Sequence, residues 1–153
     1  MGVPETETQL QQLAAIMPLV PFKGIQFLDI GYLLAHPDKM ALCIDLLLAK
    51  LEPYKDEFSA IGCFDARGFL FGPILGLRLG KKVFMLRKPG KMPRVAYTVQ
   101  YRKEYASDTK TGYDELCIQE GVLEQGEKVL LVDDVMATGG TMAAGVELVN
   151  KSK

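Results

Sequence analysis

The sequence predicts an α/β fold in which a mostly parallel sheet is flanked by helices, and three observations carry this prediction. From Ser59 onward, short apolar runs alternate with helical or loop segments, which is typical of a sheet covered on both faces. Polar or Gly-rich turns follow these runs, at the strand ends where such sheets bind ligands. The 153 residues, 48% of them hydrophobic, can bury one sizeable core, so a single domain is expected overall.

The N-terminal third is predicted to be mainly helical. A short amphipathic helix is expected over residues 6–17, and the prolines and glycine of residues 18–24 then break the chain into a loop. Pro37 and Asp38 begin a second helix, which ends near Leu51 and carries a broad apolar face.

Three apolar runs are predicted strands of the sheet: residues 60–64, 83–86 and 128–132. Residues 97–112 are polar and long, and they predict a mobile hairpin that closes over a site. We expect an N-terminal helix and hood segment over residues 1–35, followed by the core over residues 36–153.

The C-terminus is expected to be shortened. The chain stops at Lys153, a turn or two beyond the last predicted helix, whereas a doubly wound sheet normally continues with another strand. Either the sequence is a shortened form, or a partner completes the sheet.

Composition excludes several classes of function. A net charge of −1 predicts no bulk affinity for nucleic acid, and no apolar run is long enough to span a membrane. The first 17 residues lack the pattern of a signal peptide, so an intracellular, cytoplasmic protein is expected. Cys43, Cys63 and Cys117 are odd in number and lack metal-site spacing, which predicts reduced thiols. The single histidine, His36, is interpreted as a surface or capping residue.

The most specific motif is the run VLLVDDVMATGGT, from Val129 to Thr141. An apolar strand there leads into two acids and then into a Gly-rich turn that opens a helix. Unpaired N–H groups and the positive end of the helix dipole make such a turn a binding site for a dianionic phosphate. Gly139 and Gly140 permit close approach of the ligand, while Thr138 and Thr141 add hydroxyl donors.

Asp133 and Asp134 stand at the end of this strand, where carboxylates suit vicinal hydroxyls or the waters around a divalent ion. The segment lacks the glycine patterns of Walker and dinucleotide sites. An ordinary strand–turn–helix with a capping Thr is the alternative interpretation, but it does not explain two acids followed by a glycine pair.

A second anion site is predicted after the strand at residues 60–64. The turn Asp65-Ala66-Arg67 opens another helix, so its backbone amides can bind a pyrophosphate while Arg67 supplies a charged fork. The alternative is a helix capped by Asp65 with a solvated Arg67.

The segment RKPGK places three cations, Arg87, Lys88 and Lys91, within five residues after the next strand. Its Pro-Gly turn lets these cations converge on one polyanion. A solvated basic loop is the alternative.

Together these motifs resemble the type I phosphoribosyltransferases, and among them the adenine phosphoribosyltransferases. The resemblance runs from Lys23 to about Asn150, and it includes the segments KGIQFLDI at residues 23–30 and Lys103-Glu104-Tyr105. It implies the type I phosphoribosyltransferase fold and purine salvage, in which adenine and phosphoribosyl pyrophosphate give AMP and pyrophosphate. Magnesium and a homodimer are implied as well.

The resemblance also implies roles for individual residues. Glu104 handles the proton at purine N7, with Asp134 as the next catalytic candidate. The ribose 5-phosphate is bound by Asp133, Asp134, Ala137, Thr138, Gly139, Gly140 and Thr141. Pyrophosphate is bound by Asp65, Ala66, Arg67, Arg87, Lys88, Lys91 and Tyr105. Adenine is contacted by Gln26, Phe27, Leu28 and Arg67. Magnesium is held mainly by ligand oxygens and water rather than by a protein cage, and a cis peptide is expected at Asp65-Ala66.

One position departs from the family, because many members carry Arg where Leu28 stands. Two alternatives also remain at this stage. The chain could be a non-catalytic sensor of phosphoribosyl pyrophosphate or nucleotides, or a phosphoribosyltransferase for another purine. Glu104 and the three cations of the basic turn favour an enzyme, because a sensor needs neither proton transfer nor pyrophosphate expulsion.

Overall fold

The computed structural model describes residues 5–22, 24–102 and 112–152. The chain divides into two compact units, Met1–Pro53 and Tyr54–Lys153. These two units are defined by their compactness, which does not test the functional boundary that the sequence suggests at residue 35. That boundary stays a prediction.

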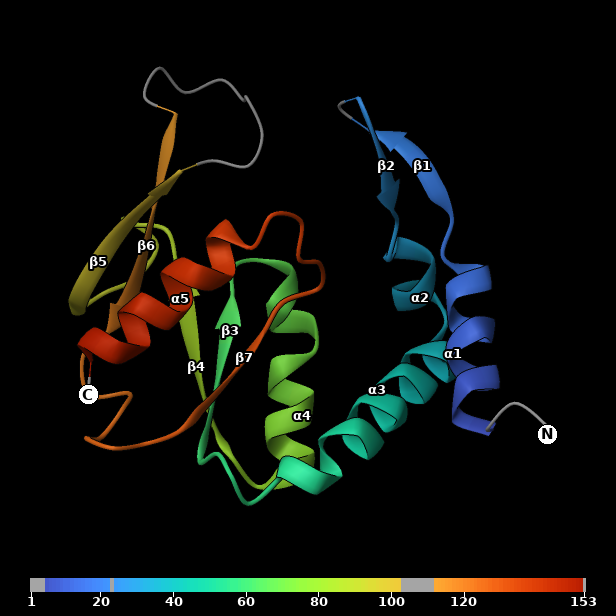
Figure 1. The fold of residues 1–153 in the computed structure, drawn as a ribbon, viewed down its shortest axis with the longest axis horizontal. Coiled ribbons are helices and arrows are strands. Elements are labelled where there is room, and N and C mark those ends of the chain that lie inside the picture. Colours follow the sequence, from blue (N-terminus) through green and yellow to red (C-terminus); the bar gives the residue numbers. More distant parts are fainter. Residues whose placement is uncertain (1–4, 23, 103–111, 153) are drawn as a thin grey trace. The chain divides into compact units, whose positions relative to one another are not determined.

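The first unit combines helices with a small hairpin (Figure 1). Its elements are α1 (Glu5–Ile16), β1 (Leu19–Phe22), β2 (Ile25–Leu28), α2 (Gly31–Ala35) and α3 (Pro37–Leu51). The predicted helices α1 and α3 are confirmed. The loop expected over residues 18–24 is wrong, because residues 19–22 form β1 and pair antiparallel with β2. A positive φ of 81° at Gly24 turns the chain between these strands.

Local sequence explains where α3 begins. His36 occupies the N-cap position and Pro37 the first turn, where the missing N–H of proline costs nothing. The imidazole Nδ1 lies 2.7 Å from the carbonyl oxygen of Tyr32, and the two rings are stacked with centroids 4.0 Å apart. His36, interpreted from the sequence as a surface or capping residue, thus occupies the N-cap position, but its side chain makes no capping hydrogen bond with α3.

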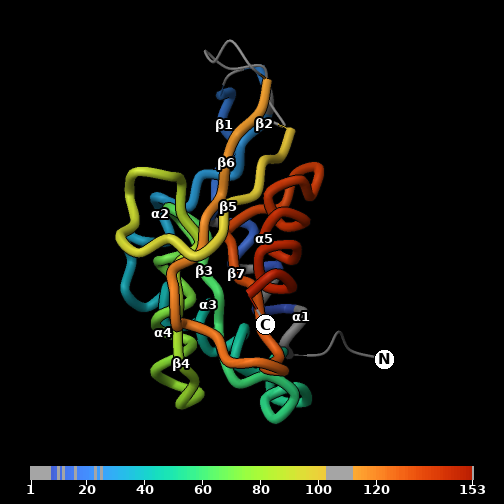
Figure 2. The backbone as a smooth tube through the Cα atoms, turned by 90° about the vertical axis from the view of Figure 1, so that its left-hand side faces the viewer, coloured from blue at the N-terminus to red at the C-terminus, as the bar shows by residue number. Residues whose placement is uncertain are grey.

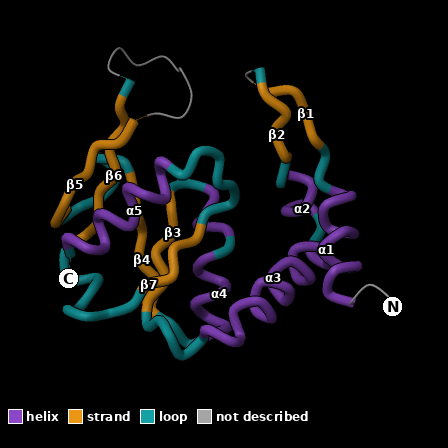
Figure 3. Tube along the Cα trace, in the orientation of Figure 1, coloured by secondary structure: helices purple, strands orange, loops and turns teal. Residues whose placement is uncertain are grey.

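The second unit contains a five-stranded sheet, drawn in orange between the helices in Figure 3. Its strands are β3 (Ala60–Phe64), β4 (Lys82–Arg87), β5 (Val95–Arg102), β6 (Tyr113–Gln119) and β7 (Val129–Val132). Their order is β5-β6-β4-β3-β7. β4, β3 and β7 are mutually parallel, whereas β6 and β5 form an antiparallel hairpin along β4. The hairpin predicted over residues 97–112 includes most of β5, but its partner strand β6 begins beyond that range, at Tyr113. Residues 103–111 lie outside the described residues, and closure over a site stays a prediction.

Helices α4 (Gly72–Leu79) and α5 (Gly140–Lys151) cover opposite faces of this sheet (Figure 2). A Cβ atom at Gly72 would collide with the Cys63 sulfur, and one at Gly145 would collide with the Phe64 ring. Because Cys63 and Phe64 are neighbours on β3, their side chains point to opposite faces. Glycine thus brings each helix close to β3.

The main hydrophobic core lies between the sheet and α5. Its most buried members include Phe64, Leu86, Ile118 and Leu148, none of them more than 1% exposed. The prediction of reduced cysteines is confirmed, since all three are free. Burial raises the pKa of the Cys63 thiol to about 11, so this side chain is a neutral packing group at pH 7.

The parallel centre of the sheet positions the candidate site. β4, β3 and β7 are neighbours that run in one direction, so their C-terminal ends lie side by side at a single edge. Three turns leave this edge, at Asp65, Lys88 and Asp133. Ligands of α/β sheets bind at such an edge. None of the helices in the described part of the chain has the length and apolar character needed to cross a membrane.

Candidate active site

The turn after β7 is built to receive an anion. α5 begins at Gly140, and Gly139 at its N-cap has a φ of 87°, a conformation that favours glycine. Gly139 has no side chain that could cap the helix, and the first turn of a helix presents backbone N–H groups that can bind an anion. The predicted opening of a helix by the glycine pair is confirmed.

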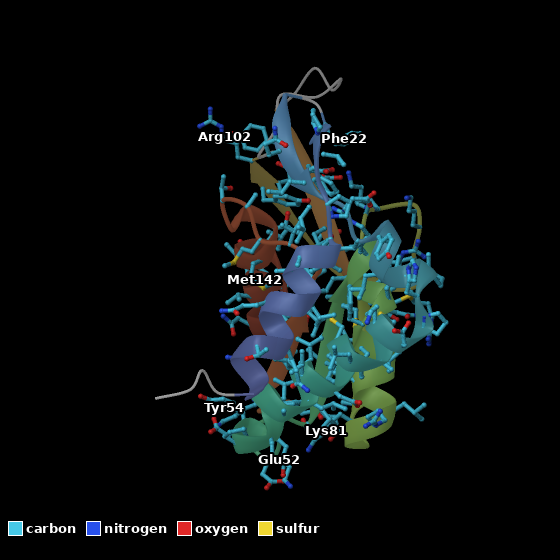
Figure 4. All side chains as sticks on the ribbon, turned by 90° about the vertical axis from the view of Figure 1, so that its right-hand side faces the viewer. Phe22, Glu52, Tyr54, Lys81, Arg102 and Met142 are labelled. Carbon is cyan, nitrogen blue, oxygen red and sulfur yellow. The ribbon has the colours of Figure 1, made fainter. Side chains whose placement is uncertain are left out.

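A small pocket lies inside this turn. It contains four of the residues expected to bind the ribose 5-phosphate, together with three apolar neighbours. The lining residues are Asp133, Val135, Met136, Ala137, Gly139, Thr141 and Met142. Thr138 and Gly140 instead line a wider hollow of about 490 Å³, which they share with α5 and with the end of β5. Arg102 is the last residue of β5 and lines this hollow, and its side chain extends away from the ribbon (Figure 4).

Asp133 and Asp134 occupy different environments. The backbone N–H of Asp134 donates to Asp133 Oδ1 over 2.9 Å. Burial raises the pKa of Asp133 to about 6, and the neighbouring Asp134 carboxyl adds to this effect. The side chain of Asp134 is 5% exposed, and its Oδ2 lies 3.0 Å from Arg67 Nε. The pair thus presents one carboxyl that titrates near neutral pH and one that is fixed in an ion pair.

The turn after β3 carries the expected cis peptide between Asp65 and Ala66. Arg67 then begins a 3₁₀ turn that ends at Leu70, and α4 follows. Gly68 packs so closely against β7 that a Cβ atom there would lie 2.5 Å from the carbonyl oxygen of Val132. Because this neighbour is backbone, it cannot move aside easily. Gly68 therefore lets the turn lie against the end of β7, where Arg67 reaches Asp134.

Arg87 connects the end of β4 to the same turn. Its Nε donates to Asp65 Oδ2 over 3.0 Å, and its terminal nitrogen donates to the carbonyl of Lys91 over 3.0 Å. Its guanidinium lies 5.6 Å from the centroid of the Phe69 ring. Lys91 Nζ approaches Asp65 Oδ2 to 4.0 Å. Two of the three predicted cations thus converge on one carboxylate.

Lys88 takes a different direction. Its ammonium lies 2.5 Å from Oδ2 of Asp114, which is the second residue of β6. Asp114 was not predicted as a site residue, and Cys117 was predicted only to be a reduced thiol. The Cys117 thiol donates to the carbonyl of Arg87 over 2.9 Å. Both lie on β6, whose recurrent apolar residues are a signal that could have predicted a strand.

The residues expected to contact adenine lie in the first unit, except for Arg67. Gln26, Phe27 and Leu28 belong to β2, and the Phe27 ring lies 5.6 Å from that of Phe22. Glu104 and Tyr105 lie outside the described residues. All of these assignments stay predictions. Within the described ranges, no cluster of three or more His, Cys, Asp or Glu side chains could hold a metal ion.

Comparison of the chain with known families identifies the class of protein that has these features. Residues 29–153 match the phosphoribosyl transferase domain family. The adenine phosphoribosyltransferase of Desulforamulus reducens is 42% identical over 132 residues, which cover 86% of this chain and 72% of that protein. The enzyme of Mastomys natalensis is 39% identical over 152 residues, covering 99% and 81%.

Solved structures agree with these relatives. The adenine phosphoribosyltransferase of Saccharomyces cerevisiae, complexed with an imino-altritol bisphosphate and adenine, superposes with a TM-score of 0.83 at 35% identity, covering 95% of this chain and 82% of that one. The enzyme of Thermoanaerobacter pseudethanolicus gives 0.82 at 37% identity, with 94% and 80% covered. The chain belongs to the phosphoribosyltransferase family, and within that family to the adenine phosphoribosyltransferases. The expected type I phosphoribosyltransferase fold is confirmed.

Proposed function

We propose that this chain transfers the 5-phosphoribosyl group of phosphoribosyl pyrophosphate to adenine, giving AMP and pyrophosphate. The observation that carries the proposal is the meeting of three turns at one sheet edge. One turn combines two acids with a helix N-terminus that opens at a glycine pair, and the other two bring Arg67, Arg87 and Lys91 to neighbouring strand ends. Such an edge can hold a sugar with a phosphate at one end and a pyrophosphate at the other.

The turn after β7 is proposed to hold the ribose 5-phosphate. Its N–H groups and the hydroxyls of Thr138 and Thr141 would donate to the phosphate oxygens, while Ala137 and the glycines leave space for it. Asp133 and Asp134 would accept hydrogen bonds from the ribose hydroxyls, which fixes the sugar for displacement at C1. The yeast relative, crystallised with a bisphosphate and adenine, supports this kind of ligand.

The cations of the other two turns are proposed to bind pyrophosphate. When the bond between ribose C1 and pyrophosphate breaks, positive charge develops on C1 and O4, and the leaving group carries the electron pair. Arg67, Arg87, Lys88 and Lys91 would stabilise that leaving anion. Asp65 and Ala66 shape the turn, and Tyr105 is proposed to cover the leaving group. A related enzyme of Trypanosoma brucei was crystallised with AMP, pyrophosphate and ribose-5-phosphate.

The base and its proton are assigned to residues of two segments. We propose that Gln26, Phe27 and Leu28 contact adenine, with the ring of Phe27 suited to stacking and Arg67 near the base. Glu104 is proposed to handle the proton at purine N7. Asp134 is the next candidate for this catalytic role, but its ion pair with Arg67 suits it better to holding the sugar.

Magnesium fits the donor set at this edge. The ion would be held mainly by ligand oxygens and water, and the acids at the end of β7, Asp133 and Asp134, suit the waters around it. When bound, the ion neutralises charge on the pyrophosphate as it departs. The cytoplasm as location and a homodimer as the assembly are proposed on the family likeness.

The proposal is tested by supplying the purified protein with phosphoribosyl pyrophosphate, Mg²⁺ and labelled adenine, hypoxanthine, guanine or xanthine under identical conditions. We expect AMP from adenine and no comparable product from the other bases. If the protein prefers another base, that base and not adenine is its substrate. Binding of phosphoribosyl pyrophosphate without turnover of any base would favour a sensor instead.

A further inference from the structure

The ion pair between Lys88 and Asp114 has no place in the scheme above. Lys88 follows the last residue of β4, and Asp114 stands near the start of β6, 26 positions later in the sequence. β4 and β6 pair only at Leu86 with Ile118 and at Arg87 with Cys117. The contact of 2.5 Å between Lys88 Nζ and Asp114 Oδ2 therefore joins the basic turn to the hairpin beyond the end of the strand pairing.

The Asp114 carboxylate is itself held in place. Its Oδ1 accepts a hydrogen bond from the backbone N–H of Glu115 over 3.1 Å, and its side chain is 21% exposed. Asp114 also pairs across the hairpin with Tyr101 of β5. One oxygen is thus fixed by backbone, and the other faces the lysine.

The Lys88 ammonium is paired with Asp114. The hydrogen bond that Lys88 donates to Asp114 is the main cause that raises the pKa of the Lys88 ammonium, and Coulombic interactions with Asp114, Tyr101 and Asp65 act in the same direction. An ammonium has three N–H donors, so a contact with Asp114 leaves donors for a further anion. Asp65 belongs to the turn after β3, and the lysine therefore lies within electrostatic reach of that turn.

We infer that Asp114 is a positioning residue that orients the Lys88 ammonium for anion binding and couples the basic turn to the β5–β6 hairpin. This inference rests on the proposed function, because it uses Lys88 as a ligand of pyrophosphate. A free lysine side chain must lose much rotational freedom when it binds an anion. Because Asp114 already holds the Lys88 ammonium, part of this rotational freedom is lost before the anion binds. Because Asp114 is the second residue of β6, the pair also joins the basic turn to the start of this strand.

The test is a double-mutant cycle of Asp114→Asn and Lys88→Met. Asparagine keeps the shape of the side chain and its contact with the backbone of Glu115 but removes the charge. Alone it should raise the KM for phosphoribosyl pyrophosphate about tenfold, with kcat and the KM for adenine changed less than about twofold. In the Lys88→Met background it should have almost no further effect. Equal effects of Asp114→Asn in both backgrounds would overturn the inference.

A neighbouring acid provides the matched control. Glu115 accepts a hydrogen bond from Gln100 across the same hairpin over 3.0 Å, and it makes no ion pair with the basic turn in the described residues. Glu115→Gln should leave the KM for phosphoribosyl pyrophosphate unchanged. A rise as large as that of Asp114→Asn would mean that any loss of charge on β6 has this effect, and it would overturn the assignment.

Binding of inorganic pyrophosphate, measured by calorimetry with Mg²⁺ present, separates this inference from the proposed function. If the wild-type protein makes no AMP, the proposed function fails, but the same cycle still reports on Lys88. A weakening of about tenfold in Asp114→Asn that disappears in the Lys88→Met background supports the inference. Unchanged pyrophosphate affinity in Asp114→Asn overturns it.

Discussion

Arg67 Nε lies 3.0 Å from Asp134 Oδ2, and this ion pair joins the turn after β3 to the turn after β7. The pair between Arg87 and Asp65 joins the end of β4 to the turn after β3 in the same way. The three strand ends are thus connected by two ion pairs in which each cation is a proposed pyrophosphate ligand. An anionic substrate meets arginines that are already oriented, which lowers the entropy lost on binding.

Asp134→Asn should weaken the binding of phosphoribosyl pyrophosphate. The amide keeps the shape but loses the charge that holds Arg67 and the ribose hydroxyls, at a cost on the order of 1–3 kcal/mol. Titration calorimetry should show a loss of about tenfold to a hundredfold in affinity. Glu147→Gln, which removes an exposed ion pair with Lys151 on α5, is the control and should bind normally. Wild-type affinity in Asp134→Asn would remove the assignment of this acid.

Asp133 should make stability fall as pH rises. Its pKa is about 6 in the folded protein against a usual 3.8, so between these values the folded state binds a proton that the unfolded chain has released. The free energy of unfolding therefore decreases as pH rises from about 4 to about 6. Asp133→Asn should raise Tm by a few degrees at pH 7 and have little effect near pH 3.

Thermal melts of both proteins across this pH range provide the measurement. An equal Tm difference at pH 3 and pH 7 would contradict the assignment of the titrating group. In the wild-type protein, affinity for phosphoribosyl pyrophosphate should rise through pH 6, because only the ionised carboxylate accepts hydrogen bonds at both oxygens.

Glu127 should contribute to stability at acid pH without affecting the site. It accepts hydrogen bonds from Lys82, Ser59 and the backbone of Glu124, next to the N-terminal ends of the parallel strands. The bond from Lys82 is the main cause that lowers its pKa from 4.5 to about 2. Its stabilisation is therefore complete above about pH 4.5 and is lost as pH falls toward 2.

Glu127→Gln should lower Tm at pH 7, with a difference that shrinks below pH 4.5, while kcat/KM at 25 °C stays at the wild-type value. These strand ends lie at the opposite edge of the sheet from the proposed site. A large loss of activity in a folded Glu127→Gln protein would show that this edge takes part in the reaction.

Glu104→Gln should lower turnover far more than substrate binding, because the amide cannot transfer the proton at purine N7. A reduction of about 10²–10⁴ in the single-turnover rate is expected for a general acid–base group. Affinity for phosphoribosyl pyrophosphate should stay within about twofold. A wild-type rate in this variant would assign the proton transfer elsewhere, with Asp134 as the next candidate.

The sequence predicts the parallel centre of the fold better than its antiparallel edge. β3, β4 and β7 are apolar runs, and their following motifs identify the strand ends that form the site. β5 is largely exposed, with the burial pattern of an edge strand rather than of a buried one, so it was predicted only as part of a polar hairpin. The helix starts at Pro37 and Gly140 follow from local chemistry and were also predictable.

The ion pairs of the site were not predictable, because they depend on distances between segments far apart in the sequence. Arg87 meets Asp65 across 22 positions, and Lys88 meets Asp114 across 26. The spacing of Arg87, Lys88 and Lys91 suggests that all three converge on one anion. The structure instead brings Arg87 and Lys91 to Asp65 and turns Lys88 toward β6.

The most direct measurement of the central claim is the balance of products in a single reaction. The purified protein would receive labelled adenine, phosphoribosyl pyrophosphate and Mg²⁺, and AMP and pyrophosphate would be quantified together. We predict one pyrophosphate for each AMP, with neither product formed when adenine or phosphoribosyl pyrophosphate is omitted. Tight binding of phosphoribosyl pyrophosphate with no AMP, or pyrophosphate release without adenine, would contradict the proposed transfer reaction.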